Sequence, residues 1–125
     1  MLIKHSADCP EIIANDGCHL RELLHPKNDP VELPYSLAIA HVDVGSSSYV
    51  HFLEQDEVYY IIEGRGRVFV GGDSAEVAAG DAVLIPGGKA QWIRNTGEQP
   101  LLFAAVVSPP WREEDDTRLD GPEED

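Results

Sequence analysis

The feature that most constrains the fold is a regular alternation of short apolar segments and turn-forming residues after Pro34. The segments are rich in Val, Ile, Tyr and Phe, and glycine, serine, asparagine or proline lies between them. Strands at this spacing, with turn chemistry at each junction, are typical of an all-β sandwich or barrel. We expect strands at residues 35–44, 50–53, 57–63, 67–70, 75–77, 82–85, 91–94 and 101–108.

The two ends of the chain divide it into three parts. Residues 1–34 form an N-terminal extension in which the prolines at 26, 30 and 34 favour extended backbone, and we expect a strand at residues 18–25. Residues 35–112 form the barrel. Residues 113–125 carry eight acidic side chains and one large apolar side chain, Leu119. Because so little surface can be buried to offset the entropy of ordering, we expect a solvated, disordered tail.

The acidic balance of the chain argues against two kinds of partner. The sequence has 23 acidic residues against 9 basic ones, a formal net charge of −14. Its field repels nucleic-acid phosphates and anionic lipid headgroups, so we expect neither nucleic acid nor a membrane as a partner. The longest apolar run, residues 101–107, is far shorter than the roughly eighteen residues of a membrane helix. The first twenty residues lack the uninterrupted apolar stretch of a signal peptide, which predicts a cytoplasmic protein.

Two groups of residues keep the spacing of a known pair of motifs. The first is Gly45-x5-His51-x-Leu53-x3-Glu57-x6-Gly64, and the second is Gly80-x5-Pro86-Gly87-Gly88-x2-Gln91-x3-Asn95. They resemble the motifs G-x5-H-x-H-x3-E-x6-G and G-x5-P-x-G-x2-H-x3-N of the cupin superfamily. The resemblance implies a double-stranded β-helix, a barrel of jelly-roll type, in which both motifs face one interior pocket. It also implies a homodimer, because cupins pair their sheets across a two-fold axis.

The same resemblance implies a metal site. Carried over by motif position, His51, Glu57 and Gln91 converge in the barrel, whereas Leu53 and Gln91 stand where the family usually has histidines. One imidazole nitrogen and two oxygens suit a divalent transition metal, and we expect Mn, Fe, Zn or Ni.

A further ligand follows from a hypothesis about strand pairing. If residues 35–44 and 50–53 form a hairpin centred near Ser46, then His41 lies directly opposite His51 on the same face. His41, His51 and Glu57 would then form a triad of two imidazoles and one carboxylate with open coordination positions.

Less functional interpretations stand beside these. His51 could be a core histidine hydrogen-bonded to Glu57 or Tyr59. Glu57 could form a buried ion pair with an arginine, for which Arg65, Arg67 and Arg94 are the candidates.

The function that the sequence predicts is therefore a small cupin that binds a divalent metal and acts on a small organic molecule. Glu57 would be a metal ligand or a catalytic acid or base. The expected substrate-binding residues are Leu53, Tyr59, Gln91 and Ile93. The reaction stays open, because cupins of this length include isomerases, dioxygenases, lyases and decarboxylases. The alternative is a metal-free barrel that binds or senses a small ligand without catalysis.

Overall fold

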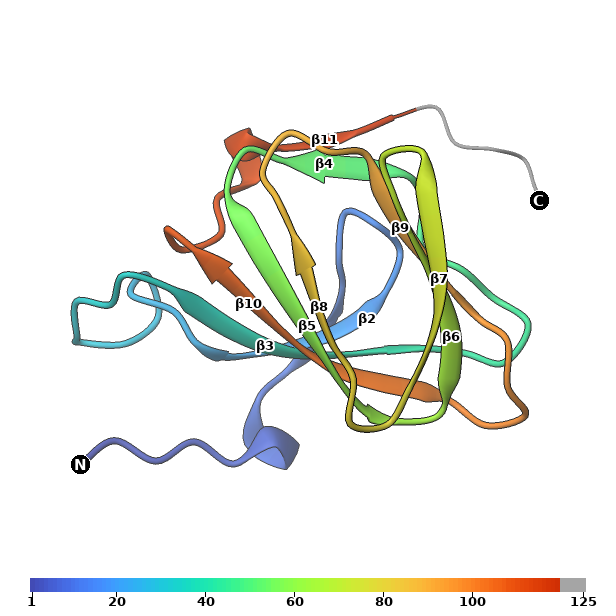
Figure 1. The fold of residues 1–125 in the computed structure, drawn as a ribbon. Helices are drawn as coiled ribbons and strands as arrows, with labels where there is room; N and C mark the ends of the chain where they lie inside the picture. The colour runs from blue at the N-terminus through green and yellow to red at the C-terminus, as the bar shows by residue number, and fades with distance from the viewer. Residues whose placement is uncertain (120–125) are drawn as a thin grey trace.

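Two antiparallel sheets face each other in the computed structural model, which describes residues 1–119 (Figure 1). The six-stranded sheet has the order β1-β2-β3-β10-β5-β8, with β1 (Glu11–Ile13), β2 (His19–Leu24), β3 (Ser36–Val42), β10 (Leu101–Ser108), β5 (Asp56–Glu63) and β8 (Ala82–Ile85). The five-stranded sheet has the order β11-β4-β9-β6-β7, with β11 (Asp116–Arg118), β4 (His51–Leu53), β9 (Gln91–Asn95), β6 (Arg65–Val70) and β7 (Asp73–Ala78). Short 3-10 turns lie at Ser6–Asp8 and Glu113–Asp115.

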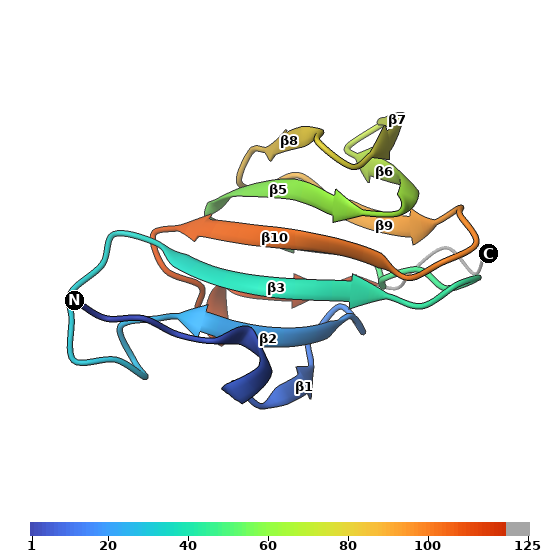
Figure 2. The same ribbon diagram turned by 90° about the horizontal axis from the view of Figure 1, so that it is seen from below.

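The architecture confirms the predicted all-β jelly-roll barrel. Each strand expected from the alternation is present, with ends that differ by a few residues, and β2 is the strand expected at residues 18–25. Figure 2 shows β2, β3, β10 and β5 side by side in the larger sheet. None of the helices in the described part of the chain has the length and apolar character that crossing a membrane requires.

Alternation along the strands builds the core. In β9 and β10 every second side chain is buried, as expected for strands with one face toward the interior. Those side chains meet between the sheets, and the largest fully buried apolar ones are Phe103, Ile61, Ile85, Ile93 and Leu101. Burial of each stabilises the fold by about 1.5–3 kcal/mol. The barrel therefore has a continuous apolar core beside which a polar site can be held rigidly.

Two motif glycines permit close approach of the backbone. Gly64 joins β5 to β6 with a φ of +92°, and a Cβ there would lie 2.8 Å from the Pro100 carbonyl oxygen. A Cβ at Gly87 would collide with the Glu54 carbonyl oxygen. Glycine avoids both problems because it reaches positive φ and has no side chain. Gly87 thus lets the second motif pack on the turn that joins β4 to β5, next to the site.

The C-terminal segment differs from the expected disordered tail. Asp116–Arg118 forms β11, which pairs with β4, and the Leu119 amide donates to the Val50 carbonyl at 2.8 Å. One edge of β4 pairs with β9 through His51 and Gln91 alone. The opposite edge carries backbone N–H and C=O groups, and β11 pairs with them. Composition predicted a solvated segment, but backbone pairing at an open edge does not require apolar side chains. Residues 120–125 of the expected tail lie outside the described residues.

Candidate functional site

A cavity of about 140 Å³ lies between the sheets. A cavity of roughly this size, about 150 Å³, can hold one benzene molecule, so the space suits a ligand of only a few heavy atoms. The side chains that line it include His51 and Leu53 of β4, Glu57 and Tyr59 of β5, and Asp116 of β11. Residues of the first cupin motif therefore meet segments near both ends of the described chain, residues 12–16 and Asp116, at this cavity.

His51 is held from one side by β11. Its side chain is 5% exposed, and Nδ1 donates to Asp116 Oδ1 at 2.9 Å. The other Asp116 oxygen accepts from Trp111 Nε1 at 3.0 Å. A carboxylate only accepts hydrogen bonds, so Asp116 fixes the proton of the imidazole on Nδ1. The second ring nitrogen, Nε2, is buried and has no hydrogen-bond partner.

Asp16, in the turn between β1 and β2, faces that second nitrogen. Its Oδ2 lies 3.5 Å from His51 Nε2, while its Oδ1 accepts from the Cys18 amide at 2.9 Å. Burial lowers the pKa of His51, but the hydrogen bond to Asp116 and the charge of Asp16 raise it by more, so the pKa lies above its ordinary value. His51 is therefore an imidazole between two carboxylates.

Glu57 lies at the end of a buried hydrogen-bond chain. Tyr59 donates to Gln91 Oε1 at 2.8 Å, and Gln91 Nε2 donates to Glu57 Oε1 at 3.0 Å. Burial raises the pKa of Glu57 to about 7 despite the opposing effects of the Gln91 hydrogen bond and of His51, and Asp16 and Asp116 add to the rise. Glu57 can thus gain or lose a proton near neutral pH.

The expected site residues divide into three groups. His51, Glu57, Leu53 and Tyr59 line the cavity. Gln91 lies behind Glu57 with both ends of its amide hydrogen-bonded, and it is not among the lining residues. Ile93 is fully buried in the core and is not among the lining residues, because it faces the apolar side chains between the sheets.

The pairing of His41 with His51 is wrong. His41 lies on β3 in the six-stranded sheet, whereas His51 lies on β4 in the other sheet, so residues 43–50 cross between the sheets and do not form a hairpin. Along β3, Ala40 and Val42 are buried and His41 is half-buried, so His41 points away from the cavity. Its neighbour is His19, whose ring stacks on it with 4.5 Å between the centroids.

The structure also bears on the interpretation of His51 as a core histidine and of Glu57 as one half of an ion pair. His51 is hydrogen-bonded to Asp116, and not to Glu57 or Tyr59. Glu57 has the neutral Gln91 amide as its hydrogen-bond partner. Arg67, one of the arginines considered for an ion pair, contacts Ser74 and Glu76 instead.

Sequence reasoning missed Asp16 and Asp116. Asp16 precedes Gly17 in a tight turn, and a sequence of this kind indicates only a hairpin. Asp116 is one of a run of acidic residues that composition assigns to solvent. Both aspartates reach His51 through pairing of strands that are distant in the sequence.

The donor groups of the cavity fit a divalent cation. Two ligands of a tetrahedral ion at bond lengths near 2.1 Å lie about 3.4 Å apart, and His51 Nε2 lies 3.5 Å from Asp16 Oδ2. That distance is long for a hydrogen bond. The Nδ1 hydrogen bond to a carboxylate is also typical of a metal-binding histidine. His51 and Asp16 are therefore the pair that would hold an ion here, and Glu57 lies beyond the 4.8 Å spacing that would group it with them.

This fold, with the spacing of the two motifs, is that of a cupin. The chain belongs to the cupin family, because the family model described as "Cupin domain" matches residues 38–107. An uncharacterised protein of Methanocaldococcus jannaschii is 40% identical over 104 residues, which cover 82% of each chain. An oxalate-binding protein of Thermotoga maritima is 30% identical over 118 residues, 86% of this chain and 93% of the relative.

Solved structures agree with this assignment. An oxalate decarboxylase of Lactobacillus farciminis in complex with formate is similar with a TM-score of 0.79 and 25% identity, over 92% of this chain but only 35% of that enzyme. A predicted oxalate decarboxylase of Thermotoga maritima is similar with a TM-score of 0.73 and 25% identity, over 86% of this chain and 99% of that one. The polyketide cyclase RemF of Streptomyces resistomycificus, 22% identical with a TM-score of 0.79 over 98% of this chain and 88% of that one, shows the fold alone.

Proposed function

We propose that this cupin holds a divalent transition-metal ion (Mn, Fe, Zn or Ni) in its cavity and binds a small organic acid beside it. The observation that carries the proposal is the unpartnered Nε2 of His51 next to an Asp16 oxygen at ligand spacing. His51 and Asp16 are the proposed ligands. Glu57 either moves closer to complete the ligand set or exchanges a proton with the bound acid, for which a pKa near 7 is suitable.

The charge balance of the cavity supports a cation. Among the described residues that line it, Lys27 is the only basic one besides His51, and Lys27 pairs with Glu22 at 3.3 Å. Asp16, Glu57 and Asp116 then surround a single imidazole. A buried excess of carboxylate is costly unless a cation or a proton compensates it. A metal ion provides that compensation.

The same charge balance limits the ligand. An organic anion would be repelled by three carboxylates unless a cation lay between them. With a cation in place, a short acid fits both the charge and the small cavity. The oxalate-binding relative and the decarboxylase structure with formate support an acid of this size. When bound, the metal would act as a Lewis acid and a template for the carboxylate oxygens.

The test is metal analysis of protein purified without an affinity tag, followed by calorimetric titration with oxalate, formate and malonate. We expect near-stoichiometric transition metal in the wild type and loss of that metal in His51→Ala and Asp16→Asn. His5→Ala removes an exposed histidine remote from these contacts and serves as the control. Acid binding should disappear when a chelator removes the metal. Full metal content in His51→Ala would end the ligand assignment.

A metal-free binding barrel is the second candidate function. The observation in its favour is that a protonated His51 between Asp16 and Asp116 is itself a compensating charge, consistent with its raised pKa. The remaining negative charge would favour a neutral or cationic ligand. Acid binding that survives the chelator without change would contradict the metal-dependent function.

We also propose that the protein is a homodimer through the outer face of the six-stranded sheet. Tyr60 of β5 and Leu84 of β8 are 50% and 67% exposed, and the pairing of these strands places them close together. Ile62, on the same face of β5, is 38% exposed. Exposed apolar side chains gathered on one sheet face mark an interaction surface, and a second copy of the chain would cover them symmetrically.

A further inference from the structure

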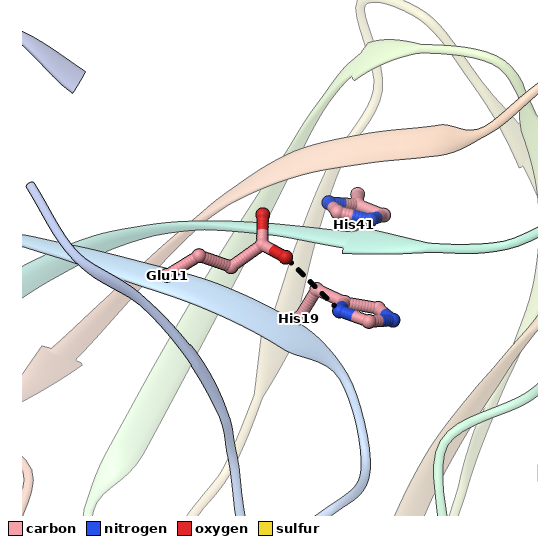
Figure 3. Close-up of side chains that lie close together, drawn as sticks. All are labelled: Glu11, His19 and His41. Atoms are coloured by element: carbon pink, nitrogen blue, oxygen red, sulfur yellow. Dashed lines mark hydrogen bonds and ion pairs between the residues drawn. The ribbon is translucent and has the colours of Figure 1, made fainter. Parts of the chain in front are cut away.

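We propose that Glu11, His19 and His41 form a second metal site, for Zn²⁺ or a similar divalent ion, on the outer face of the six-stranded sheet. Figure 3 shows the two imidazole rings one above the other with the Glu11 carboxylate beside them. One ligand atom from each residue lies within 4.8 Å of the other two. Among residues 1–119, this is the only place where at least three His, Cys, Asp or Glu side chains meet that criterion.

The sheet itself brings the three residues together. His19 of β2 and His41 of β3 are direct cross-strand partners, so their side chains leave the same face. Glu11 of β1 is paired with Arg21, two residues along β2 from His19, so it lies on that face as well. Backbone pairing of three adjacent strands therefore fixes the spacing. Both histidine side chains are about one-third exposed, at 31% and 29%, so an ion can reach them from solvent.

The contacts of His19 show a need for a cation. Its Nδ1 lies 3.2 Å from Glu11 Oε2, and its Nε2 lies 3.4 Å from Asp43 Oδ2. A neutral imidazole has one N–H and one lone pair. One of the two carboxylates therefore faces a lone pair, which is repulsive. Either a second proton or a metal ion removes the repulsion.

The stacking of the two rings favours a metal ion over protons. The ring planes of His19 and His41 are within 3° of parallel, with centroids 4.5 Å apart. Two protonated rings in this position would repel each other, whereas one divalent ion would replace both protons once the rings tilt from parallel so that their in-plane lone pairs converge on it. Asp43 also lies 3.5 Å from His41 Nε2, so one carboxylate faces the Nε2 atoms of both rings. Carboxylates that accept the other ring N–H are typical of metal-binding histidines.

The ligand set is chemically suitable. Two imidazoles and one carboxylate hold Zn²⁺ with a coordination position left open, and Ni²⁺ and Co²⁺ accept the same donors. Ligand atoms now within 4.8 Å need to approach to about 3.4 Å, which side-chain rotation can provide. Arg21 lies 3.7 Å from Glu11 Oε1, but its guanidinium is also bonded to the Cys9 carbonyl, so Arg21 keeps a partner when Glu11 turns to the ion.

An ion at this outer site would affect the cavity indirectly, by holding the β1–β2 hairpin in place. It would tie β1 to β2 and β3, and the turn that follows β1 carries Asp16, which faces His51. β1 is an edge strand of three residues and is otherwise held by β2 alone. We therefore assign the outer site a stabilising role for the hairpin that brings Asp16 into the cavity.

The experiment uses the full chain without an affinity tag, freed of metal and titrated with Zn²⁺ by calorimetry. We expect His19→Ala and His41→Ala each to weaken one class of Zn²⁺ site by at least about tenfold. His51→Ala should keep that class, and His5→Ala should match the wild type. Glu11→Gln should weaken it while leaving the side-chain size unchanged. Hydrogen exchange of residues 11–13 should slow on Zn²⁺ addition in the wild type and in His51→Ala.

The outcomes separate this site from the one in the cavity. Zn²⁺ binding in His19→Ala and His41→Ala that equals the wild type would overturn the outer site, as would an equal loss in His5→Ala. Loss of binding in His19→Ala together with an unchanged His51→Ala supports the outer site and counts against the metal in the cavity.

Discussion

His51 on β4 donates a hydrogen bond of 2.9 Å to Asp116 on β11, and both side chains are 5% exposed. The two residues are 65 positions apart in the sequence. The bond fixes the proton on Nδ1 and leaves Nε2 for Asp16 or a bound ion. The C-terminal segment is therefore part of the site and not a solvated extension of the barrel.

Asp116→Ala should destabilise the protein by about 2 kcal/mol, because His51 Nδ1 and Trp111 Nε1 would lose their acceptor. Urea unfolding measures the change. Thr117→Ala, exposed on the same strand, should change the free energy of unfolding by less than about 0.5 kcal/mol. Equal effects of the two substitutions would show that the buried bond contributes nothing.

Glu57 should make the metal-free protein less stable as the pH rises. Its pKa is about 7 in the folded state against an ordinary value of 4.5, so between these values the folded state holds a proton that the unfolded state has lost. The contribution of Glu57 to the free energy of unfolding is therefore fully present below pH 4.5. It falls by about 3 kcal/mol in total as the pH rises to about 7. The measurement is urea unfolding across this range in the presence of a chelator.

Glu57→Gln should abolish this part of the pH dependence, since the amide cannot ionise. Between pH 4.5 and pH 7.5 the free energy of unfolding of the wild type should then fall by about 3 kcal/mol relative to that of the variant. Glu63→Gln, at the exposed end of the same strand, should follow the wild type. Parallel curves for the wild type and Glu57→Gln would mean that Glu57 ionises equally in both states.

Gln91 should act by positioning Glu57 and not as a ligand. Gln91→Leu removes the donor to Glu57 and the acceptor of Tyr59, both buried, and should cost about 3 kcal/mol in urea unfolding. Tyr59→Phe breaks only the bond to Gln91 and should cost about 1 kcal/mol.

The pH profile tests the positioning role separately. The Gln91 hydrogen bond lowers the pKa of Glu57, so the ionisation of Glu57 should move to higher pH in Gln91→Leu and stay in place in Tyr59→Phe. An unchanged profile in Gln91→Leu would reduce Gln91 to a packing residue.

Much of the barrel could be predicted because its information is local. Alternating burial, as in β9 and β10, follows from the types of consecutive residues, and Gly64 lies in a turn that needs positive φ. The motif spacing likewise placed His51 and Glu57 at one cavity. These features depend on side-chain period and turn chemistry, which a single sequence displays.

The partners of those residues could not be predicted, because they depend on which strands pair. The segment after β3 looks like a hairpin turn, but it crosses between sheets, which moves His41 to the outer face beside His19. Asp116 belongs to an acidic segment, and it reaches the site only because β11 pairs with the open edge of β4. Local sequence does not encode the sheet that a strand joins, so Asp16, Asp116 and the outer cluster emerge only from the three-dimensional structure.

The outer sheet face provides the last prediction. Analytical ultracentrifugation of the wild type should give twice the 13.7 kDa mass of one chain. Leu84→Glu and Tyr60→Glu place a charge among the exposed apolar side chains of β8 and β5, and they should shift the species toward the monomer. Val31→Glu changes an exposed apolar residue outside the strands and should leave the dimer intact. A wild type that sediments as a monomer over a wide concentration range would exclude the dimer.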